Sequence, residues 1–360
     1  YEQLYNLQKP DWKIDPINLI NKPDKNSLEY KVVSKVTKDL KLTLLELLFK
    51  LGYISSIENL LVTSFHKQYF PHGSELPALE INDHASDIPF NQTLKVFSID
   101  DALTTEIDDA FSLQATDTGW IVGVHISAPS LNKELLTLAS ERLSTVYYPG
   151  HKITMLPENV IAHYSLDQGK QLPVVSIYFT IDHEFNISHT ESKLEQVLVS
   201  DNLRTENLEQ LFNVENMAQD HGYPYEAELK LLHQFALKLE EGRGKASVNQ
   251  LSVDYNFSFA EDGKVVIKPR LRGNPIDKLV SELMIHANGS WGRMLTNAFV
   301  PAIYRVKQPM QPVTMTLTPN SHTGLNVDYY TWATSPLRRA VDLVNQAQII
   351  SLITKQKPLS

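Results

Sequence analysis

The sequence FSIDDALTTEIDDAFSL, residues 97–113, places five carboxylates within ten residues. They are Asp100, Asp101, Glu106, Asp108 and Asp109. Apolar residues at 96–99 and 110–113 predict that core strands flank the acids. Carboxylates this close repel one another and raise one another's pKa, which a bound divalent cation would relieve. Oxygen ligands without thiolates favour Mg²⁺ or Mn²⁺ over zinc. The alternative is a solvated acidic turn.

Composition limits the class of protein. The 360 residues include no cysteine, which excludes disulfide partners, zinc–thiolate sites and cysteine nucleophiles. No run of eighteen apolar residues and no leader-like start are present, so we expect a soluble, cytoplasmic protein without a membrane partner. The sequence leaves the oligomeric state open, and we favour a monomer. A formal charge of −9 argues against a surface that coats nucleic acid, although a locally basic lining is compatible with it.

The first part of the chain differs in pattern from the rest. Residues 1–25 contain three prolines and are expected to form an extended lead-in. Apolar residues at helical spacing predict short helices over 27–70. These helices form either a nucleic-acid-binding module of the winged-helix or helix-turn-helix kind, or a packing unit. Residues 71–91 resemble a linker. We therefore divide the chain into a lead-in, helical module and linker (1–92) and a catalytic domain (93–360).

Strands and helices are mixed in the second part. Strands at 109–114 and 120–127 flank a turn signal, so a hairpin is expected to start at the acids. The strands at 253–259 and 264–268 flank Asp-Gly, a second hairpin signal. A long helix is predicted from about 277 to 298, and a closing helix over 336–353 begins with proline. The fold class is therefore α+β, with a mixed sheet packed against helices.

The spacing of the acids resembles the signature of the ribonuclease II / ribonuclease R (RNB-domain) exoribonucleases. Asp100 is followed after five residues by Glu106, and after one more by Asp108-Asp109. Further segments match in the same order: VGVHIS (122–127), YYPGHKITMLPENV (147–160), LVSELMIHAN (279–288), PAIYRV (301–306), TSPLRR (334–339) and DLV (342–344). The resemblance implies an RNB catalytic core that hydrolyses single-stranded RNA processively from the 3′ end to nucleoside 5′-monophosphates with a divalent metal.

Cleavage of a phosphodiester needs charge neutralisation and an activated water, which carboxylate-bound Mg²⁺ can provide. The resemblance implies that Asp100, Glu106, Asp108 and Asp109 are catalytic and bind Mg²⁺ or Mn²⁺. Asp100 and Asp109 are the first choices as ligands, and Asp108 is expected to be the most critical acid. Glu106 stands where the best-known members carry aspartate. Asp101 is expected to be a bystander.

The TSPLRR segment supplies the opposite charge. Arg338, just inside a helix start marked by Ser335 and Pro336, can direct a guanidinium and a helix N-terminus at a phosphate. Arg339 is expected to contact the RNA backbone, and Ser335 belongs to the same substrate-binding set. The alternative for each arginine is a structural salt bridge.

Two further residues are implied to bind substrate. Glu282 aligns with an acidic position that contacts the terminal ribose in relatives. The 2′-hydroxyl of this ribose distinguishes RNA from DNA. Tyr147 matches an aromatic that can stack on any base. The alternatives are a solvated glutamate and a core aromatic. His125 is expected to be a hydrogen-bonded core histidine.

Several positions depart from the family pattern. Thr205 stands in place of a tyrosine, Ala340 in place of an aromatic, and Gln346-Ala347 in place of a His-Arg pair. These departures affect the expected binding of RNA, the length of the final product and processivity. The second hypothesis is therefore a catalytically impaired RNB scaffold that binds RNA or a protein partner without cutting. The family's flanking RNA-binding barrels are not recognisable in these 360 residues, which implies either a trimmed chain or a divergent member.

Overall fold

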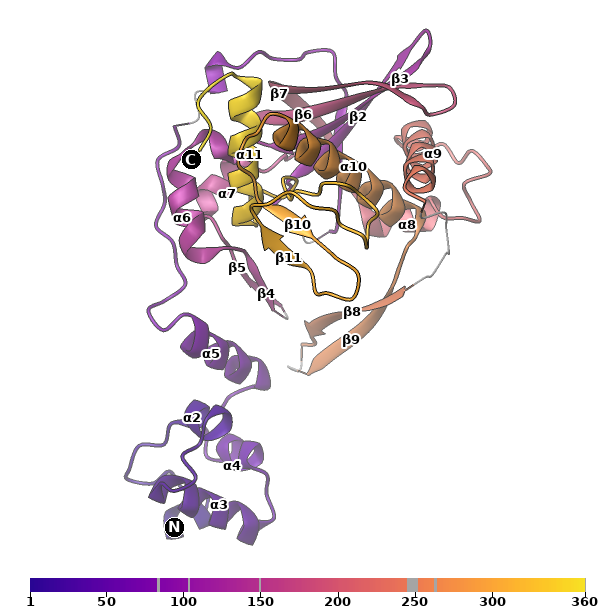
Figure 1. Cartoon of the computed structure of the whole chain (residues 1–360). Helices are drawn as coiled ribbons and strands as arrows, with labels where there is room; N and C mark the ends of the chain where they lie inside the picture. The colour runs from indigo at the N-terminus through magenta and orange to yellow at the C-terminus, as the bar shows by residue number, and fades with distance from the viewer. Residues whose placement is uncertain (83–84, 103, 149, 245–251, 262–263, 360) are drawn as a thin grey trace. The chain divides into compact units, whose positions relative to one another are not determined.

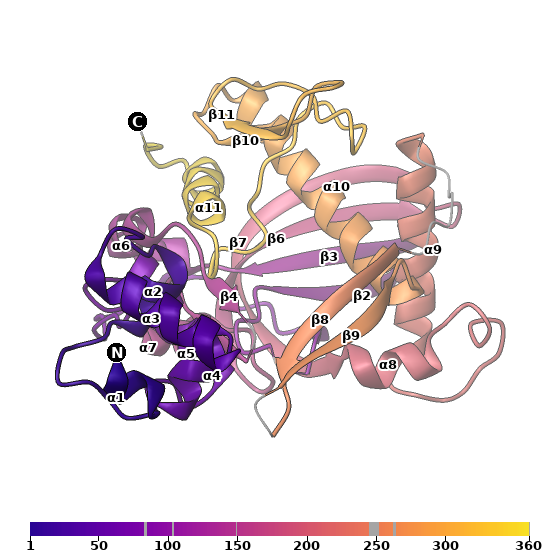
Figure 2. The same ribbon diagram turned by 90° about the horizontal axis from the view of Figure 1, so that it is seen from below.

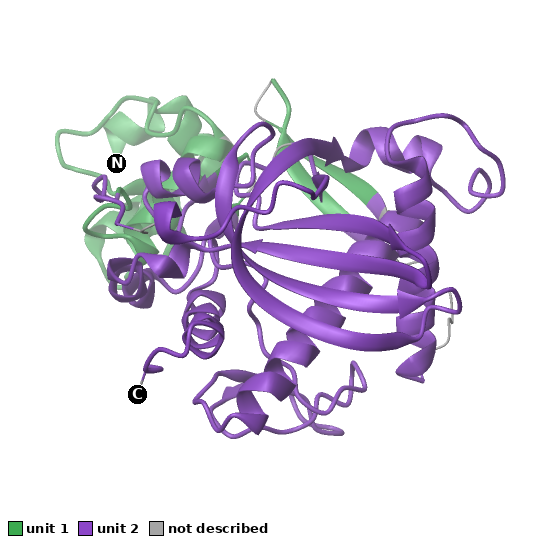
Figure 3. Cartoon of the chain, turned by 90° about the horizontal axis from the view of Figure 1, so that it is seen from above, with its two compact units in different colours: residues 1–75, 148–151, 255–269 green, residues 76–147, 152–254, 270–360 purple. Residues whose placement is uncertain are grey.

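The computed structural model of the chain describes residues 1–82, 85–102, 104–148, 150–244, 252–261 and 264–359. It contains two compact units (Figure 3). Unit 1 comprises residues 1–75, 148–151 and 255–269, and unit 2 comprises residues 76–147, 152–254 and 270–360. The predicted domain boundary near residue 93 stays a prediction. Within the described ranges, no helix has the length and apolar character needed to cross a membrane.

Unit 1 contains five short helices: α1 (Glu2–Tyr5), α2 (Pro16–Asn21), α3 (Leu28–Leu40), α4 (Leu44–Lys50) and α5 (Ile57–Tyr69). The helices predicted over 27–70 are confirmed, while a nucleic-acid-binding role for them stays a prediction. The extended lead-in predicted over 1–25 is wrong. Asp15 caps a helix that begins with Pro16, and Leu4 and Leu19 are buried in the core of the unit.

Unit 2 is organised around a closed five-stranded barrel (Figure 1). Its strands, in barrel order, are β1 (Val96–Asp100), β2 (Asp109–Thr116), β3 (Gly119–Ser127), β6 (Gln171–Asp182) and β7 (Ile187–Arg204). Neighbouring strands are antiparallel except β1 and β7, which are parallel. The mixed sheet and the hairpin that starts at the acids are thus confirmed.

His125 confirms the prediction of a satisfied core histidine. It lies on β3 with no exposed surface. Its Nδ1 lies 2.8 Å from Ser176 Oγ and its Nε2 lies 2.8 Å from Ser112 Oγ, so both ring nitrogens have partners in the neighbouring strands. Burial lowers its pKa to about 4, which keeps the ring neutral at physiological pH.

The remaining elements lie outside the barrel strands, and most residues of β8 and β9 belong to unit 1. They are η1 (Ala85–Asp87), η2 (Pro129–Leu131), α6 (Glu134–Arg142), β4 (Val146–Tyr148), β5 (His151–Ile153), α7 (Glu158–Tyr164), α8 (Thr205–Leu211), α9 (Glu226–Gly242), β8 (Ser252–Phe259), β9 (Val265–Arg272), α10 (Pro275–Asn297), β10 (Tyr304–Val306), β11 (Thr314–Thr316) and α11 (Ala340–Ile353). The long helix α10 crosses the barrel strands (Figure 2), and its Trp291 donates a hydrogen bond to Ser192 on β7 at 3.1 Å.

The remaining sequence predictions differ in outcome. The second hairpin is confirmed because β8 pairs with β9, while its Asp-Gly turn at 262–263 lies outside the described residues. The long helix predicted over 277–298 is confirmed by α10. The start of the closing helix is wrong: α11 begins at Ala340, four residues after the proline. The Asp342 carboxylate accepts a hydrogen bond from the Ser335 N–H and holds the residues before Ala340 in a turn.

Candidate active site

The acidic segment connects two neighbouring strands of the barrel. Asp100 ends β1 and Asp109 begins β2, and the two strands pair antiparallel, so both carboxylates lie at one end of the barrel. Burial raises the pKa of Asp100 to about 6 and that of Asp109 to about 7. The neighbouring charge of Asp100 raises the pKa of Asp109 further. This pair is therefore short of positive charge.

Asp108 links the acidic segment to the TSPLRR turn. Its side chain is 3% exposed, and its Oδ1 accepts a hydrogen bond from the backbone N–H of Leu337 at 2.8 Å, across 229 positions of sequence. Its Oδ2 lies 3.4 Å from Arg338 Nε and has no hydrogen-bond partner among the described residues. Burial raises the pKa of Asp108 well above its usual value, although Arg338 opposes this. The fold thus brings together the two oppositely charged halves that the sequence predicted.

The TSPLRR segment is a turn that precedes α11. Asp342 Oδ1 accepts hydrogen bonds from the Ser335 N–H at 2.9 Å and from Arg339 Nη2 at 2.7 Å. These contacts hold Pro336–Arg338 in a turn, so the helix starts only at Ala340 and the predicted helix N-terminus at Arg338 is wrong. Arg338 instead reaches Asp108 from the turn, and its Nη2 donates to Ser335 Oγ at 3.0 Å.

Arg339 is engaged within the protein. Besides its ion pair with Asp342, its guanidinium lies 4.2 Å from the ring centroid of Trp332. Both contacts belong to the structural salt-bridge alternative. The RNA contact of Arg339 therefore stays a prediction.

Glu106 is turned toward a different set of partners. Its carboxylate is buried and accepts hydrogen bonds from Thr145 Oγ1 at 3.0 Å, Tyr147 Oη at 3.2 Å and Lys152 Nζ at 3.0 Å. Both carboxylate oxygens are occupied by these donors. In the described parts of the chain, no three histidine, aspartate or glutamate side chains form a ready-made metal site. The role of Glu106 as a metal ligand stays a prediction that its contacts do not support.

The other three carboxylates, Asp100, Asp108 and Asp109, stay predicted ligands of a hard divalent cation. Asp108 Oδ2 is a buried acceptor without a hydrogen bond among the described residues, and its ion pair with Arg338 at 3.4 Å compensates it. Burial raises the pKa values of both Asp100 and Asp109, and the charge of Asp100 raises the pKa of Asp109 further, as expected where a counter-charge is missing. Oxygen donors of this kind suit Mg²⁺.

The two predicted substrate-binding residues differ in their surroundings. Tyr147 is 58% exposed, while its hydroxyl is held by Glu106, so its ring is fixed at one end and open to solvent. The Thr145 N–H, two residues before Tyr147, donates to the Arg338 carbonyl at 2.9 Å, which places this stretch of chain beside the TSPLRR turn. Glu282 is 4% exposed, and both of its oxygens accept hydrogen bonds from Arg243 Nη2 at 2.5 Å. The structure joins Tyr147 to the acidic site and gives Glu282 an internal partner.

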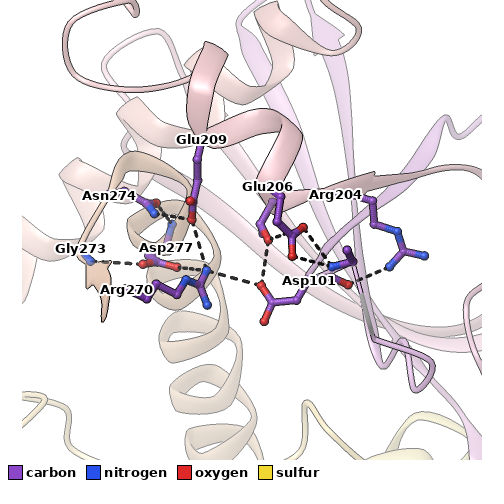
Figure 4. Close-up of polar contacts among 10 residues, drawn as sticks. Asp101, Arg204, Glu206, Glu209, Arg270, Gly273, Asn274 and Asp277 are labelled. Atoms are coloured by element: carbon purple, nitrogen blue, oxygen red, sulfur yellow. Dashed lines mark hydrogen bonds and ion pairs between the residues drawn. The ribbon is translucent and has the colours of Figure 1, made fainter. Parts of the chain in front are cut away.

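Sequence reasoning missed the residues that hold the acidic segment in place. Lys152 pairs with Glu106 from β5, and Arg270 lies 3.5 Å from Asp101 Oδ1 (Figure 4). Lys152 lies inside the matching YYPGHKITMLPENV segment, and a cation there was a usable signal. Arg270 lies in the basic stretch 264–272, but this stretch gave no signal for the partners of Arg270, because they come from other elements.

Residues 91–316 and 306–355 match the RNB domain. The chain belongs to the RNB domain family. It is 26% identical over 291 residues to a protein of Synechocystis named "Uncharacterized ribonuclease sll1290", covering 71% of this chain and 42% of that protein. The chain thus spans less than half the length of this relative. The α+β fold and the family resemblance are confirmed.

Solved RNB structures have the same fold. RNase R of Mycoplasma genitalium in complex with ribose-methylated single-stranded RNA gives a TM-score of 0.67 at 17% identity, covering 82% of this chain and 57% of that one. An active-site mutant of the Dss1 exoribonuclease of Candida glabrata gives a TM-score of 0.75 at 17% identity. The match covers 99% of this chain and 53% of Dss1. Yeast Ssd1, a pseudonuclease, gives a TM-score of 0.61 at 16% identity. The match covers 80% of this chain and 43% of Ssd1.

Proposed function

We propose that this RNB protein is a metal-dependent exoribonuclease that degrades single-stranded RNA processively from the 3′ end to nucleoside 5′-monophosphates, as a cytoplasmic monomer. The observation that carries the proposal is the contact of Asp108 with both Leu337 and Arg338. It places a guanidinium next to an acidic cluster that is short of positive charge. Anion-binding and cation-binding groups side by side are what phosphodiester hydrolysis requires.

Each residue has a task that follows from its position. Asp100, Asp108 and Asp109 would hold Mg²⁺, or Mn²⁺ in its place, and the bound ion supplies charge neutralisation and a water that is nucleophilic near neutral pH. Arg338, whose side chain is 40% exposed, can present its guanidinium to a non-bridging phosphate oxygen. The exposed ring of Tyr147 can stack on a base of any identity, which suits degradation without sequence preference.

The remaining predicted residues act at the edge of this site. Glu106 keeps Tyr147 and Lys152 in place and remains a candidate for a fourth ligand. Ser335 orients Arg338 through its hydroxyl. RNA contacts of Glu282 and Arg339 require that each loosens its present ion pair.

The experiment is incubation of single-stranded RNA with the protein in Mg²⁺ or in EDTA. RNA labelled at the 5′ end should shorten from its 3′ end, and RNA labelled at the 3′ end should release its label at once as a nucleoside 5′-monophosphate. EDTA and Asp108→Asn should each abolish both signals. Asp117→Asn, which alters an exposed carboxylate in the β2–β3 turn, is the matched control and should leave them unchanged. Internal fragments or 3′-phosphate products would contradict the proposal.

The second candidate is an RNB scaffold that binds RNA or a protein partner without cutting. The pairing of Glu106 with Lys152 favours it, because one of the four predicted ligands is neutralised within the protein. The similarity to the pseudonuclease Ssd1 is compatible with this reading. Binding of RNA without any shortening, in Mg²⁺ and in Mn²⁺, would favour this candidate over the first.

A further inference from the structure

Arg270, near the end of β9, contacts three carboxylates that come from three separate parts of unit 2 (Figure 4). Its Nη2 lies 3.5 Å from Asp101 Oδ1 in the acidic segment, 3.3 Å from Glu209 Oε1 on α8 and 3.4 Å from Asp277 Oδ1 on α10. Its side chain is 19% exposed, and those of Asp101, Glu209 and Asp277 are 55%, 34% and 18% exposed, so solvent screens the Asp101 contact most. One cation therefore joins the acidic segment to two helices.

Asp101 is held from a second side by the start of α8. The same oxygen, Oδ1, accepts a hydrogen bond from Thr205 Oγ1 at 2.8 Å. Both carboxylate oxygens of Glu206 accept from the Ala102 N–H at 3.0 Å, and Arg204 Nη1 donates to the Asp101 carbonyl at 3.1 Å. Thr205 stands where the family resemblance implies a tyrosine, so this departure places a threonine hydroxyl against Asp101.

The opposite end of the acidic segment is fixed by the residues that follow α7 and by β3. The Ile107 N–H donates to Ser165 Oγ at 3.1 Å, and the Ile107 carbonyl accepts from the Leu166 N–H at 3.0 Å. The Asp108 carbonyl accepts from the Ser127 N–H at 2.9 Å. Two backbone hydrogen bonds and one to Ser165 thus fix the end near Asp108, whereas the end near Asp100 is fixed by an ion pair and by hydrogen bonds that each involve a side chain.

We propose that Arg270 and Thr205 are positioning residues that hold Asp101 and thereby keep Asp100 next to Asp109 in the arrangement that accepts a divalent cation. Without Arg270, Asp101, Glu209 and Asp277 lose the cation that they share, and like-charge repulsion would move the acidic segment away from α8 and α10. Asp101 is then a structural anchor and not the bystander that the sequence suggested. The functional part of this inference rests on the proposed exonuclease activity.

The test compares Arg270→Gln and Thr205→Val with their conservative partners Arg270→Lys, which keeps the charge, and Thr205→Ser, which keeps the hydroxyl. Arg293→Gln is the matched control, because it removes an exposed arginine of α10 whose ion pair with Asp328 lies outside this network. The first readout is hydrogen–deuterium exchange in EDTA. Peptides over 101–108 should exchange faster in Arg270→Gln and Thr205→Val, and as in the wild type in the other three variants.

The second readout is the Mg²⁺ concentration that half-saturates RNA shortening. Arg270→Gln should raise it by about tenfold, the scale of coupling between residues in contact, while RNA affinity in EDTA changes by less than about twofold. Asp101→Asn should raise the half-saturating Mg²⁺ concentration by a similar factor. The double variant of Asp101→Asn with Arg270→Gln should need no more Mg²⁺ than either single variant. Additive effects in this cycle would overturn the proposal.

The outcomes separate the two proposals. If the wild-type protein does not shorten RNA, the proposed function fails, while exchange of 101–108 still decides whether Arg270 holds the segment. If shortening occurs, and Arg270→Gln weakens RNA affinity without changing the Mg²⁺ dependence, Arg270 is an RNA contact and the positioning role is wrong. Unchanged exchange over 101–108 in Arg270→Gln would overturn it as well.

Discussion

The family resemblance implies that Glu106 is a metal ligand, but its hydrogen bonds to Thr145, Tyr147 and Lys152 are those of a structural residue. Three donors surround its buried carboxylate. We expect Glu106→Gln to lower the free energy of unfolding by about 1 to 3 kcal/mol, because Lys152 loses its buried counter-charge. The same change should raise the half-saturating Mg²⁺ concentration less than Asp109→Asn does. Denaturant unfolding and a Mg²⁺ titration of activity measure the two effects, and the reverse order would make Glu106 a ligand.

The raised pKa values of Asp100 and Asp109 predict a dependence of stability on pH. Their folded pKa values, about 6 and about 7, lie above the ordinary value for aspartate. The folded state therefore holds these protons more tightly, and their contribution to stability is lost as pH rises through the folded pKa. In EDTA, Asp109→Asn should raise the melting temperature relative to the wild type by an amount that grows between pH 5 and pH 8. A constant or shrinking difference would show that the carboxylates are not short of positive charge.

The turn before α11 is the element whose geometry matters most for the site. Asp342 is fully buried, and one of its oxygens holds both Ser335 and Arg339. Asp342→Asn removes the charge from a buried ion pair and should cost about 3 kcal/mol in urea unfolding. RNA shortening should fall with it, because Ser335 and Arg338 depend on the same turn. Asp328→Asn, in an exposed pair, should cost less than about 0.5 kcal/mol. Equal costs for the two variants would exclude a special role for Asp342.

Local patterns predicted the elements that local contacts stabilise. The β2–β3 hairpin, α3 to α5 and α10 follow from apolar periodicity, caps and turn residues. The parallel pairing of β1 with β7 did not follow, because it joins segments about a hundred residues apart without a local signal. The start of α11 was misplaced because a buried carboxylate at Asp342 outweighs the proline signal.

The candidate site divides in the same way. Asp108 and Arg338 were predicted to belong together from the family resemblance, which covers the chain from about residue 94 to about residue 350, and the structure joins them. The contacts of Glu106 with Lys152, and of Asp101 with Arg270, depend on which distant cation the fold delivers. The sequence of the acidic segment does not show which of its carboxylates have a distant cation as partner. Predicted metal ligands and structural anchors can therefore be told apart only in the folded chain.

At the scale of the whole molecule, the negative charge limits how RNA can be held. With a formal charge of −9, binding has to rely on a few local cations and on stacking by residues such as Tyr147. We expect a shallow salt dependence, with a slope of log K against log salt concentration of about −2, which corresponds to about three phosphates. Fluorescence anisotropy of a labelled single strand in EDTA measures it. A slope steeper than about −5 would require an extensive basic surface that this account does not contain.

The central claim is that Asp108 and Arg338 form one hydrolytic centre. Its most direct test is the single-turnover rate of 3′-end shortening at saturating Mg²⁺, measured with RNA affinity for the wild type, Asp108→Asn and Asp117→Asn. Asparagine keeps the hydrogen bond from Leu337 while removing the charge that faces Arg338. We predict that Asp108→Asn binds RNA within about threefold of the wild type and loses at least about a hundredfold in rate, while Asp117→Asn matches the wild type. An Asp108→Asn protein that shortens RNA at the wild-type rate would contradict the account.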